Sequence, residues 1–179
     1  MNPRISVYIA ASLDGFIARP DGDLDWLHAA AAEGEDYGYD EFLAGIDLVA
    51  MGRGTYDHIA GIDPVPYGGR PVEVFTSRPP APREGVAFVA QPASDAVARW
   101  TVQGVRNVYV DGGELIRQFL AIGAVDDLVV TVVPLILGEG LALFPPSGVE
   151  TPLRLTGTQS WPSGMVQLRY AVARPAAGS

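Results

Sequence analysis

Met51-Gly52-Arg53-Gly54-Thr55-Tyr56 and Asp111-Gly112-Gly113-Glu114 decide the fold, because each ends an apolar run and opens a helical pattern. The apolar runs before them, residues 46–50 and 107–110, are typical of buried strands. Each stretch therefore predicts a strand, a tight glycine turn and the start of a helix. Unpaired N–H groups at helix starts bind anions, and two such turns in a short chain suggest one long ligand with several phosphates. This pattern favours a nucleotide cofactor.

Both glycine turns have two interpretations that the sequence leaves open. At residues 52–55, backbone N–H groups, the Thr55 hydroxyl and Arg53 bind a phosphate, or glycine only provides a positive φ for an ordinary strand-to-helix turn. The pair Gly112-Gly113 has the same two interpretations, although a glycine pair lets the backbone approach a pyrophosphate closely. Neither turn matches the dinucleotide fingerprint G-x-G-x-x-G.

The apolar patterning predicts the secondary structure and its class. β-branched runs predict strands at residues 5–11, 48–51, 72–76, 86–90, 107–110, 128–133, 153–159 and 166–172. Helices are expected at residues 40–44, 92–103 and 115–122, and in the second of these Val97, Trp100 and Val102 should face the core. Strands alternating with helices indicate an α/β fold with a mostly parallel central sheet, and the last two strands should form an antiparallel hairpin. We expect one domain over residues 1–174 and a disordered tail at residues 175–179.

Composition excludes several classes of protein. The chain has 179 residues, a net charge of -9 and twelve basic residues, which are all Arg. An acidic chain is a poor nucleic-acid binder, and the absence of Lys and Cys excludes Schiff-base lysines, thiolate nucleophiles and cysteine metal sites. The two histidines, His28 and His58, have no third ligand type near them, so we expect no metal site and place both on helix surfaces. No apolar stretch is long enough to span a bilayer, and a cytoplasmic protein is expected.

Three further segments have a functional and a structural interpretation. Thr76-Ser77-Arg78 ends a strand, where α/β sheets bind ligands. Arg78 is either a partner for a 2′-phosphate, which would select NADPH over NADH, or a solvated loop arginine. The loop at residues 12–18 is either a cover for a nicotinamide ring or a plain turn at Asp14-Gly15. Trp26 is either a core residue or a stacking platform for a ligand.

These motifs occur in the order of a known superfamily. In sequence order they are Ala11-Ser12-Leu13-Asp14-Gly15, Asp25-Trp26, the turn at residues 51–56, Thr76-Ser77-Arg78, Asp111-Gly112-Gly113 and residues 131–140. This series resembles the dihydrofolate reductase-like superfamily, in particular the branch of the RibD C-terminal reductase domain of riboflavin synthesis, over residues 5–172. The resemblance implies an α/β fold with a central, mostly parallel eight-stranded sheet that ends in an antiparallel hairpin. It also implies NADPH as the hydride donor.

The resemblance implies roles for individual residues. The cofactor-binding residues would be Ala11 and Gly15 beside the nicotinamide, Gly52, Arg53 and Thr55 at the adenosine-side phosphates, Thr76, Ser77 and Arg78 at the 2′-phosphate, and Asp111, Gly112 and Gly113 at the pyrophosphate. Asp14 and Thr131 are expected to be catalytic. Trp26 and Tyr56 are expected to bind the substrate.

The sequence departs from this superfamily in residues that act on the substrate. Dihydrofolate reductases carry a carboxylate on the helix before the Met-Gly-Arg motif, and Asp36 and Asp40 are both candidates for it here. The riboflavin reductases carry a Lys in the first strand where this sequence has Tyr8, and their substrate bears a phosphate that this chain has no Lys to hold.

We expect an NADPH-dependent reductase that transfers hydride to a C=N or C=O of a small pteridine- or aminopyrimidine-like substrate, a class that includes 5-amino-6-(5-phosphoribosylamino)uracil. The alternatives are a non-catalytic nucleotide-binding protein on the same fold and a reductase that uses a reduced deazaflavin. The last two strands carry large apolar residues at the edge of the predicted sheet. Because an exposed apolar edge invites pairing, we expect a two-fold homodimer through that edge.

Overall fold

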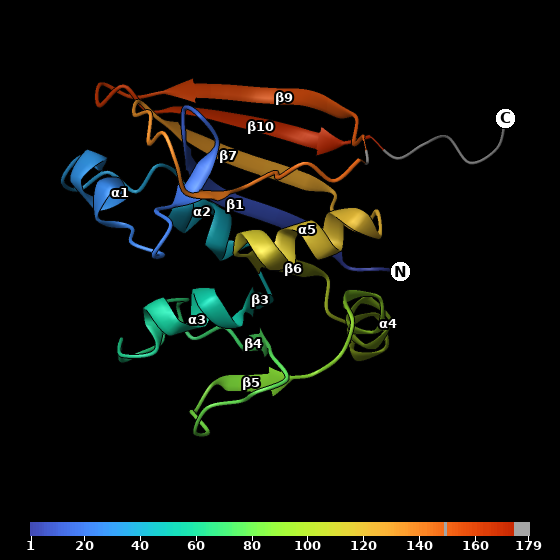
Figure 1. Cartoon of the computed structure of the whole chain (residues 1–179). Coiled ribbons are helices and arrows are strands. Elements are labelled where there is room, and N and C mark those ends of the chain that lie inside the picture. The colour runs from blue at the N-terminus through green and yellow to red at the C-terminus, as the bar shows by residue number, and fades with distance from the viewer. Residues whose placement is uncertain (149, 174–179) are drawn as a thin grey trace, which may run out of the picture. The chain divides into compact units, whose positions relative to one another are not determined.

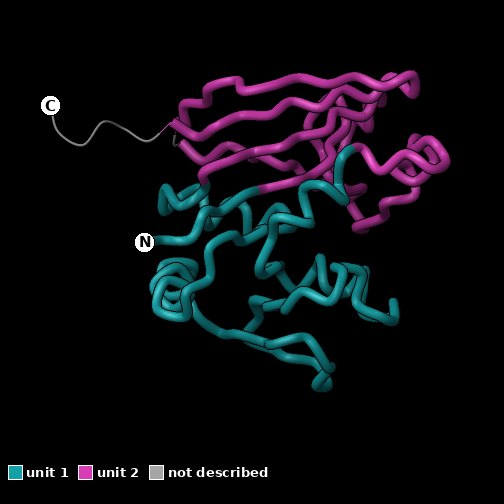
Figure 2. The backbone as a smooth tube through the Cα atoms, turned by 180° about the vertical axis from the view of Figure 1, so that it is seen from behind, with its two compact units in different colours: residues 1–6, 38–125 teal, residues 7–37, 126–179 magenta. Residues whose placement is uncertain are grey.

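The computed structural model describes residues 1–148 and 150–173, and the tail expected at residues 175–179 lies outside them. The chain divides into two compact units (Figure 2). Unit 1 comprises residues 1–6 and 38–125, and unit 2 comprises residues 7–37 and 126–179. The expectation of one domain over residues 1–174 remains a prediction.

Eight strands form the main sheet in the order β5-β4-β3-β6-β1-β7-β10-β9 (Figure 1). They are β1 (Arg4–Ser12), β3 (Leu48–Gly52), β4 (Val72–Phe75), β5 (Val86–Val89), β6 (Asn107–Asp111), β7 (Asp127–Val133), β9 (Leu153–Ser160) and β10 (Val166–Val172). The pairs β1–β6, β6–β3, β3–β4 and β4–β5 are parallel, whereas β10 is antiparallel to both β7 and β9. The predicted α/β class, the mostly parallel sheet and the C-terminal hairpin are confirmed.

Two short strands, β2 (Phe16–Ala18) and β8 (Leu141–Ala142), pair in a separate antiparallel sheet that was not expected from the sequence. The described helices are α1 (Asp25–Ala30), α2 (Tyr39–Ala44), α3 (Arg53–Ile59), α4 (Ala93–Gln103) and α5 (Gly113–Ala121). The expectation that Val102 faces the core is wrong, because Val102 is 89% exposed. Ala93, Ala96 and Trp100 fill the inward face of α4 at helical spacing instead.

Unit 1 packs its parallel strands under α4 and α5. The side chains of β3 and β4 are buried on both faces, as parallel strands require when helices cover them. Trp100 of α4 stacks on Phe119 of α5 with ring centroids 5.7 Å apart. The indole Nε1 of Trp100 donates to the buried carboxylate of Glu73 at 3.0 Å, and Arg99 forms two further hydrogen bonds to that carboxylate at 2.8 and 2.6 Å. This arrangement pairs the buried charge and leaves α4 firmly attached to β4.

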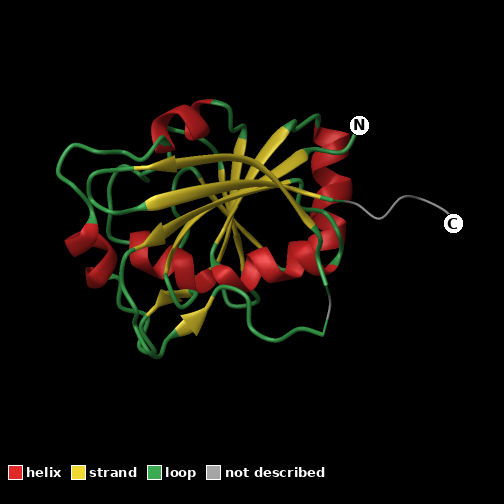
Figure 3. Ribbon diagram, turned by 90° about the horizontal axis from the view of Figure 1, so that it is seen from above, coloured by secondary structure: helices red, strands yellow, loops and turns green. Residues whose placement is uncertain are grey.

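The regular secondary structure of unit 2 consists mainly of strands, and its described part contains one helix, α1. Figure 3 distinguishes the strands of the chain from its helices. The hairpin of β9 and β10 closes through a turn in which the Trp161 N–H donates to the Met165 carbonyl at 3.0 Å. A core cluster of Trp26, Val133 and Met165 joins α1 to β7 and to the start of β10. Trp26, a helix residue that was a candidate site residue in the sequence, therefore packs against the sheet.

Candidate functional site

The two glycine turns of unit 1 lie against each other. Gly52 ends β3 and precedes α3, while Gly112 follows β6 and precedes α5, and β3 and β6 are parallel neighbours. A Cβ atom on Gly112 would overlap the Thr55 hydroxyl and would lie 3.3 Å from the Thr55 Cβ. The structure thus brings together the two turns that the sequence predicted to bind one ligand.

The glycines of the first turn are not required by backbone angle or by packing. Gly52 has a φ of -78° and Gly54 lies within α3. Apart from the adjacent residues and, for Gly54, the backbone of α3 itself, no heavy atom lies within 4 Å of the position a Cβ would take at either glycine. The interpretation in which glycine provides a positive φ at residues 52–55 is therefore wrong. The backbone at Gly52 and Gly54 is therefore not covered by other side chains and borders open space.

Arg53 connects this turn to the residues that follow β4. Its Nε donates to the Asp57 carboxylate at 2.7 Å, and its Nη1 donates to the carbonyl oxygen of Arg78 at 2.7 Å. The Thr76 hydroxyl accepts a hydrogen bond from the backbone N–H of Arg78 at 3.1 Å. Arg53 therefore holds the backbone of residues 76–78 close to the first glycine turn, while the side chain of Arg78 remains exposed.

Asp111 lies at the end of β6 among tyrosines. Its carboxylate accepts hydrogen bonds from the Gly112 N–H at 2.8 Å and from the Tyr67 hydroxyl at 3.2 Å. Burial raises the pKa of the Asp111 carboxyl. The Gly112 N–H is thus occupied by Asp111, so a pyrophosphate at this turn would have to use the N–H groups that follow it in α5.

Tyr56 lies in the core of unit 1. Its ring is buried and packs edge-to-face on Phe88, with centroids 5.3 Å apart. This position gives no support to the predicted role of Tyr56 in substrate binding, which stays a prediction.

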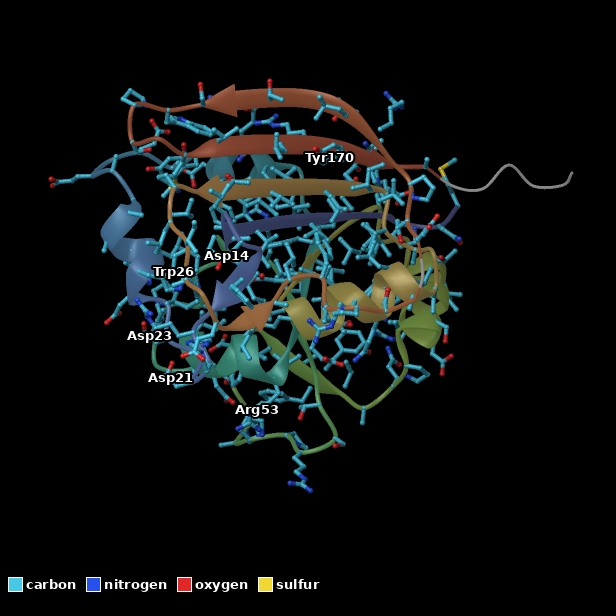
Figure 4. All side chains as sticks on the ribbon, turned by 45° about the horizontal axis from the view of Figure 1, so that its top comes forward. Asp14, Asp21, Asp23, Trp26, Arg53 and Tyr170 are labelled. Atoms are coloured by element: carbon cyan, nitrogen blue, oxygen red, sulfur yellow. The ribbon has the colours of Figure 1, made fainter. Side chains whose placement is uncertain are left out.

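In unit 2, Asp14 anchors the turn after β1 (Figure 4). Its carboxylate accepts hydrogen bonds from the Ser12 hydroxyl at 2.6 Å and from the backbone N–H groups of Leu137 and Gly138 at 3.0 and 2.7 Å. The bond from Ser12, together with those from the backbone, lowers the pKa of the Asp14 carboxyl. A carboxylate held in this way stays ionised, so any catalytic role of Asp14 would be that of an anion and not of a proton donor. Gly15 follows it with a φ of 87°, which favours glycine.

Trp26 has the most unusual environment of the predicted site residues. The side chain is 5% exposed, and its indole Nε1 is buried without a hydrogen-bond partner. Tyr37, Leu137 and Trp161 pack against its cluster. A buried donor without a partner is rare in folded proteins and needs an explanation, and a bound ligand that accepts this hydrogen bond supplies one.

Thr131 and Ala11 are buried in β7 and β1. The Thr131 hydroxyl accepts a hydrogen bond from the side-chain amide of Gln167 at 3.1 Å. The sequence did not indicate a role for Gln167, Tyr37 or Trp161. Gln167 lies with Arg169 in an otherwise apolar and aromatic strand, and only its pairing with Thr131 across β10 and β7 reveals its position.

The position of neither Asp36 nor Asp40 identifies it as the proton-donating carboxylate. Asp36 belongs to unit 2 and Asp40 to α2 of unit 1, and both residues are exposed. The charge of Asp36 contributes to raising the pKa of Tyr8, although burial is the larger cause. His28 and His58 lie exposed on α1 and α3, as expected.

Within residues 1–148 and 150–173, no three or more His, Asp or Glu side chains are grouped to hold a metal ion. Across the same residues, no helix combines the length and the apolar character needed to cross a bilayer.

Comparison with known proteins identifies the family. The sequence profile of the RibD C-terminal domain matches residues 70–167. The uncharacterized protein YwjB of Bacillus subtilis (strain 168) is 40% identical over 176 residues, which cover 97% of this chain and 100% of YwjB. A crystal structure from Shewanella sp. PV-4, provisionally described as a riboflavin biosynthesis protein, is 30% identical with a TM-score of 0.87 and covers 96% of this chain and 99% of that chain.

A more distant structure shows the same fold. The Thermotoga maritima diaminohydroxyphosphoribosylaminopyrimidine deaminase/5-amino-6-(5-phosphoribosylamino)uracil reductase is 14% identical with a TM-score of 0.72, covering 96% of this chain and 57% of that chain. The profile match over more than half of the sequence, together with the identity to YwjB, shows that this chain belongs to the RibD C-terminal domain family of the dihydrofolate reductase-like superfamily.

Proposed function

We propose that this chain is an NADPH-dependent reductase that binds the phosphate groups of the cofactor on unit 1. Membership of the RibD C-terminal domain family supports a reductase. The observation that carries the use of a phosphate-rich cofactor is the uncovered backbone at Gly52 and Gly54. Glycine at two positions that need neither its backbone freedom nor its small size is explained if a ligand approaches the backbone there.

The residues beside this backbone suit a dinucleotide with a 2′-phosphate. Thr55 offers a hydroxyl next to the Gly112 turn, and α5 begins at Gly113 with N–H groups suited to a pyrophosphate. Arg78 presents an exposed guanidinium on a backbone that Arg53 holds in place. A guanidinium forms charge-assisted hydrogen bonds with phosphate, so Arg78 would distinguish NADPH from NADH.

When bound, NADPH supplies the hydride, and the protein supplies binding and orientation. On unit 2, the unpaired indole N–H of Trp26 would donate a hydrogen bond to the substrate. Asp14 would hold the turn at Gly15 by accepting hydrogen bonds from the backbone N–H groups of Leu137 and Gly138. A small substrate with a C=N or C=O bond in a pteridine- or aminopyrimidine-like ring fits this proposal.

Cofactor binding and turnover test the proposal separately. NADPH should quench the tryptophan fluorescence of the chain, and NADPH should be oxidised when pteridines, aminopyrimidines and quinones are offered as a panel. Binding without turnover of any compound would favour a non-catalytic nucleotide-binding protein. No binding of NADPH up to about 1 mM, an affinity limit near -4 kcal/mol, would overturn the proposal.

We also propose that the chain forms a two-fold homodimer through its sheet edge. β9 is the last strand of the main sheet, and Leu153, Leu155 and Val166 are 42%, 52% and 38% exposed on the β9–β10 hairpin. An apolar sheet edge invites pairing with another chain. Light scattering should give twice the chain mass of 18.9 kDa, and a mass near 18.9 kDa would reject the dimer.

A further inference from the structure

Arg83 binds the end of α3 from the loop at residues 76–85, which connects β4 to β5. Its Nη1 donates hydrogen bonds to the carbonyl oxygens of Ile59 and Ala60 at 3.1 Å each. Its Nη2 donates to the carbonyl oxygen of Ile62. The last carbonyls of a helix have no partners within the helix, and their partial negative charge favours a cation. Arg83 therefore holds the end of α3 through both hydrogen bonds and charge.

The end of α3 has no glycine cap that could take the place of Arg83. A glycine in the left-handed conformation closes many helices, as Gly104 does at the end of α4 with a φ of 74°. The C-cap residue of α3, Ala60, keeps a helical φ of -58°, and the next residue, Gly61, does not have a positive φ. The carbonyls at this end thus bind a side chain from another loop.

The beginning of the same loop is attached to the other end of α3. Arg53, the first residue of α3 (Figure 4), donates through its Nη1 to the carbonyl oxygen of Arg78 at 2.7 Å. One anchor therefore comes from the helix and the other, Arg83, comes from the loop. Together they attach the loop to both ends of one helix of 7 residues.

The segment between the two anchors is stiff and has few hydrogen bonds of its own. Residues 79–82 are Pro-Pro-Ala-Pro, and proline has no N–H to donate. In the described structure, residues 77–82 form hydrogen bonds only at Arg78. Because proline fixes φ, a proline-rich segment acts as a semi-rigid spacer. The position of Arg78 therefore depends on where Arg83 holds the far end of this spacer.

We propose that Arg83 is a positioning residue which, together with Arg53, fixes the exposed guanidinium of Arg78 and so sets the preference of the chain for NADPH over NADH. This inference rests on the proposed function and adds to it a residue that acts through Arg78. Arg83 was not a candidate site residue in the sequence, because only its hydrogen bonds to carbonyls of α3 and the residues after it reveal this role.

The variant Arg83→Met tests the preference directly. Methionine keeps much of the length of the side chain and removes the hydrogen bonds to Ile59, Ala60 and Ile62. The affinity for NADPH should fall about fivefold, whereas the affinity for NADH should not change, because only NADPH carries the phosphate that Arg78 would bind. Isothermal titration of the full-length variant with both cofactors measures the ratio of the two affinities.

Arg70 provides a matched control in the same unit. Its guanidinium also donates to three backbone carbonyls, which belong to Ile46, Tyr67 and Gly68. None of these bonds reaches α3 or the loop at residues 76–85. Arg70→Met should therefore lose stability, as Arg83→Met does, but keep the wild-type ratio of NADPH affinity to NADH affinity. A merely structural role of Arg83 would give the same result in both variants.

The Arg78→Ala background separates positioning from an effect of charge alone. If Arg83 acts through Arg78, adding Arg83→Met to Arg78→Ala should change the NADPH affinity by less than about twofold. A cation that attracted the phosphate by its own charge would give the same loss with and without Arg78, and that result would overturn the inference.

Nitrogen-15 relaxation of the cofactor-free chain tests the anchoring without NADPH. The amides of Arg78 and Ala81 should have order parameters of about 0.85 in the wild type, which is typical of rigid backbone, and below about 0.6 in Arg83→Met. Pro82→Gly leaves the side chain of Arg83 in place but loosens the spacer. It should lower the same order parameters and reduce the preference for NADPH at least about twofold.

Rigid amides at Arg78 and Ala81 in both variants, or an unchanged ratio of the two cofactor affinities, would overturn the inference while the proposed function stands. If Arg83→Met does not fold, Pro82→Gly decides through the same two measurements. If NADPH does not bind to the wild type, the proposed function fails and the preference fails with it, whereas the order parameters still decide whether Arg83 anchors the loop.

Discussion

The turns at Gly52–Gly54 and at Gly112 use the same residue type for opposite reasons. Gly112 has a φ of 88°, and the Thr55 side chain occupies the space that a Cβ would need. Gly52 and Gly54 have backbone angles that any residue adopts and open space beside them. The fold therefore requires glycine at Gly112 but not at Gly52 or Gly54, and the proposed function assigns the latter two to ligand binding. The sequence alone does not distinguish a glycine that the fold requires from one that it does not, whereas the structure does.

The largest effect is expected at the turn that the fold requires. Gly112→Ala should lower the free energy of unfolding by about 3 kcal/mol, since it combines backbone strain with an overlap against Thr55. Urea unfolding followed by circular dichroism measures this loss. The double variant Gly112→Ala with Thr55→Ala lacks the overlapping hydroxyl and should recover part of the lost stability. If it recovers none, the overlap with Thr55 is not the cause of the loss.

Arg78→Ala tests whether the chain binds the 2′-phosphate of NADPH. Loss of a charge-assisted hydrogen bond to the 2′-phosphate should weaken NADPH by about 1.5–3 kcal/mol. NADH has no 2′-phosphate, so its affinity should hardly change. Isothermal titration with both cofactors measures the difference, and equal losses for NADPH and NADH would mean that Arg78 acts through the structure of the loop.

Gly54→Ala separates stability from binding in one variant. Alanine in place of glycine within α3 should raise the free energy of unfolding by up to about 1 kcal/mol, because Gly54 is helical and uncrowded. The added methyl group should at the same time weaken NADPH about tenfold by covering the backbone. A more stable variant with unchanged NADPH affinity would contradict a ligand role for this turn.

The smallest expected effect is the loss of stability in Asp14→Asn, at the turn that contains Gly15. The pKa of Asp14 is lowered from its ordinary value of 3.8 in the folded chain, so its contribution to stability is complete above that value and disappears as the pH falls through the lower folded pKa. Asp14→Asn should therefore be less stable than the wild type near neutral pH, and the gap should close in acid. Urea unfolding at several pH values follows the gap, and a gap that does not change with pH would show that the charge of Asp14 does not hold the turn.

The main sheet was predictable because most of its strands are local apolar runs, and the end of each run marks where the turns occur; β9 is an exception, since it is largely polar and exposed. β2 and β8 were missed because each contains very few residues and their pairing depends on Asp14 holding Leu137 and Gly138, far along the chain. Trp26 was visible as an isolated large residue beside Asp25. Gln167 and Tyr37 were not visible, because their importance arises from hydrogen bonds between distant parts of the sequence.

The same limit explains the ambiguity at the glycine turns. A sequence records that Gly52, Gly54 and Gly112 lack side chains, but not whether a neighbour or open space lies beside them. Thr55 of α3 lies close to Gly112 in the turn after β6, and no local sequence pattern predicts that these residues are neighbours. Tyr56 was expected to bind the substrate, yet its ring is buried and packs edge-to-face on Phe88.

The most direct test of the central claim is an NADPH titration followed by the backbone amide resonances of the glycines. We predict that NADPH shifts the amide resonances of Gly52, Gly54 and Gly113, and that NADH needs at least about tenfold higher concentration for the same shifts. Gly104, which ends α4 with a φ of 74°, serves as the internal control and should not move. Unmoved amides at Gly52 and Gly54 while NADPH binds elsewhere, or no binding of NADPH, would contradict the account.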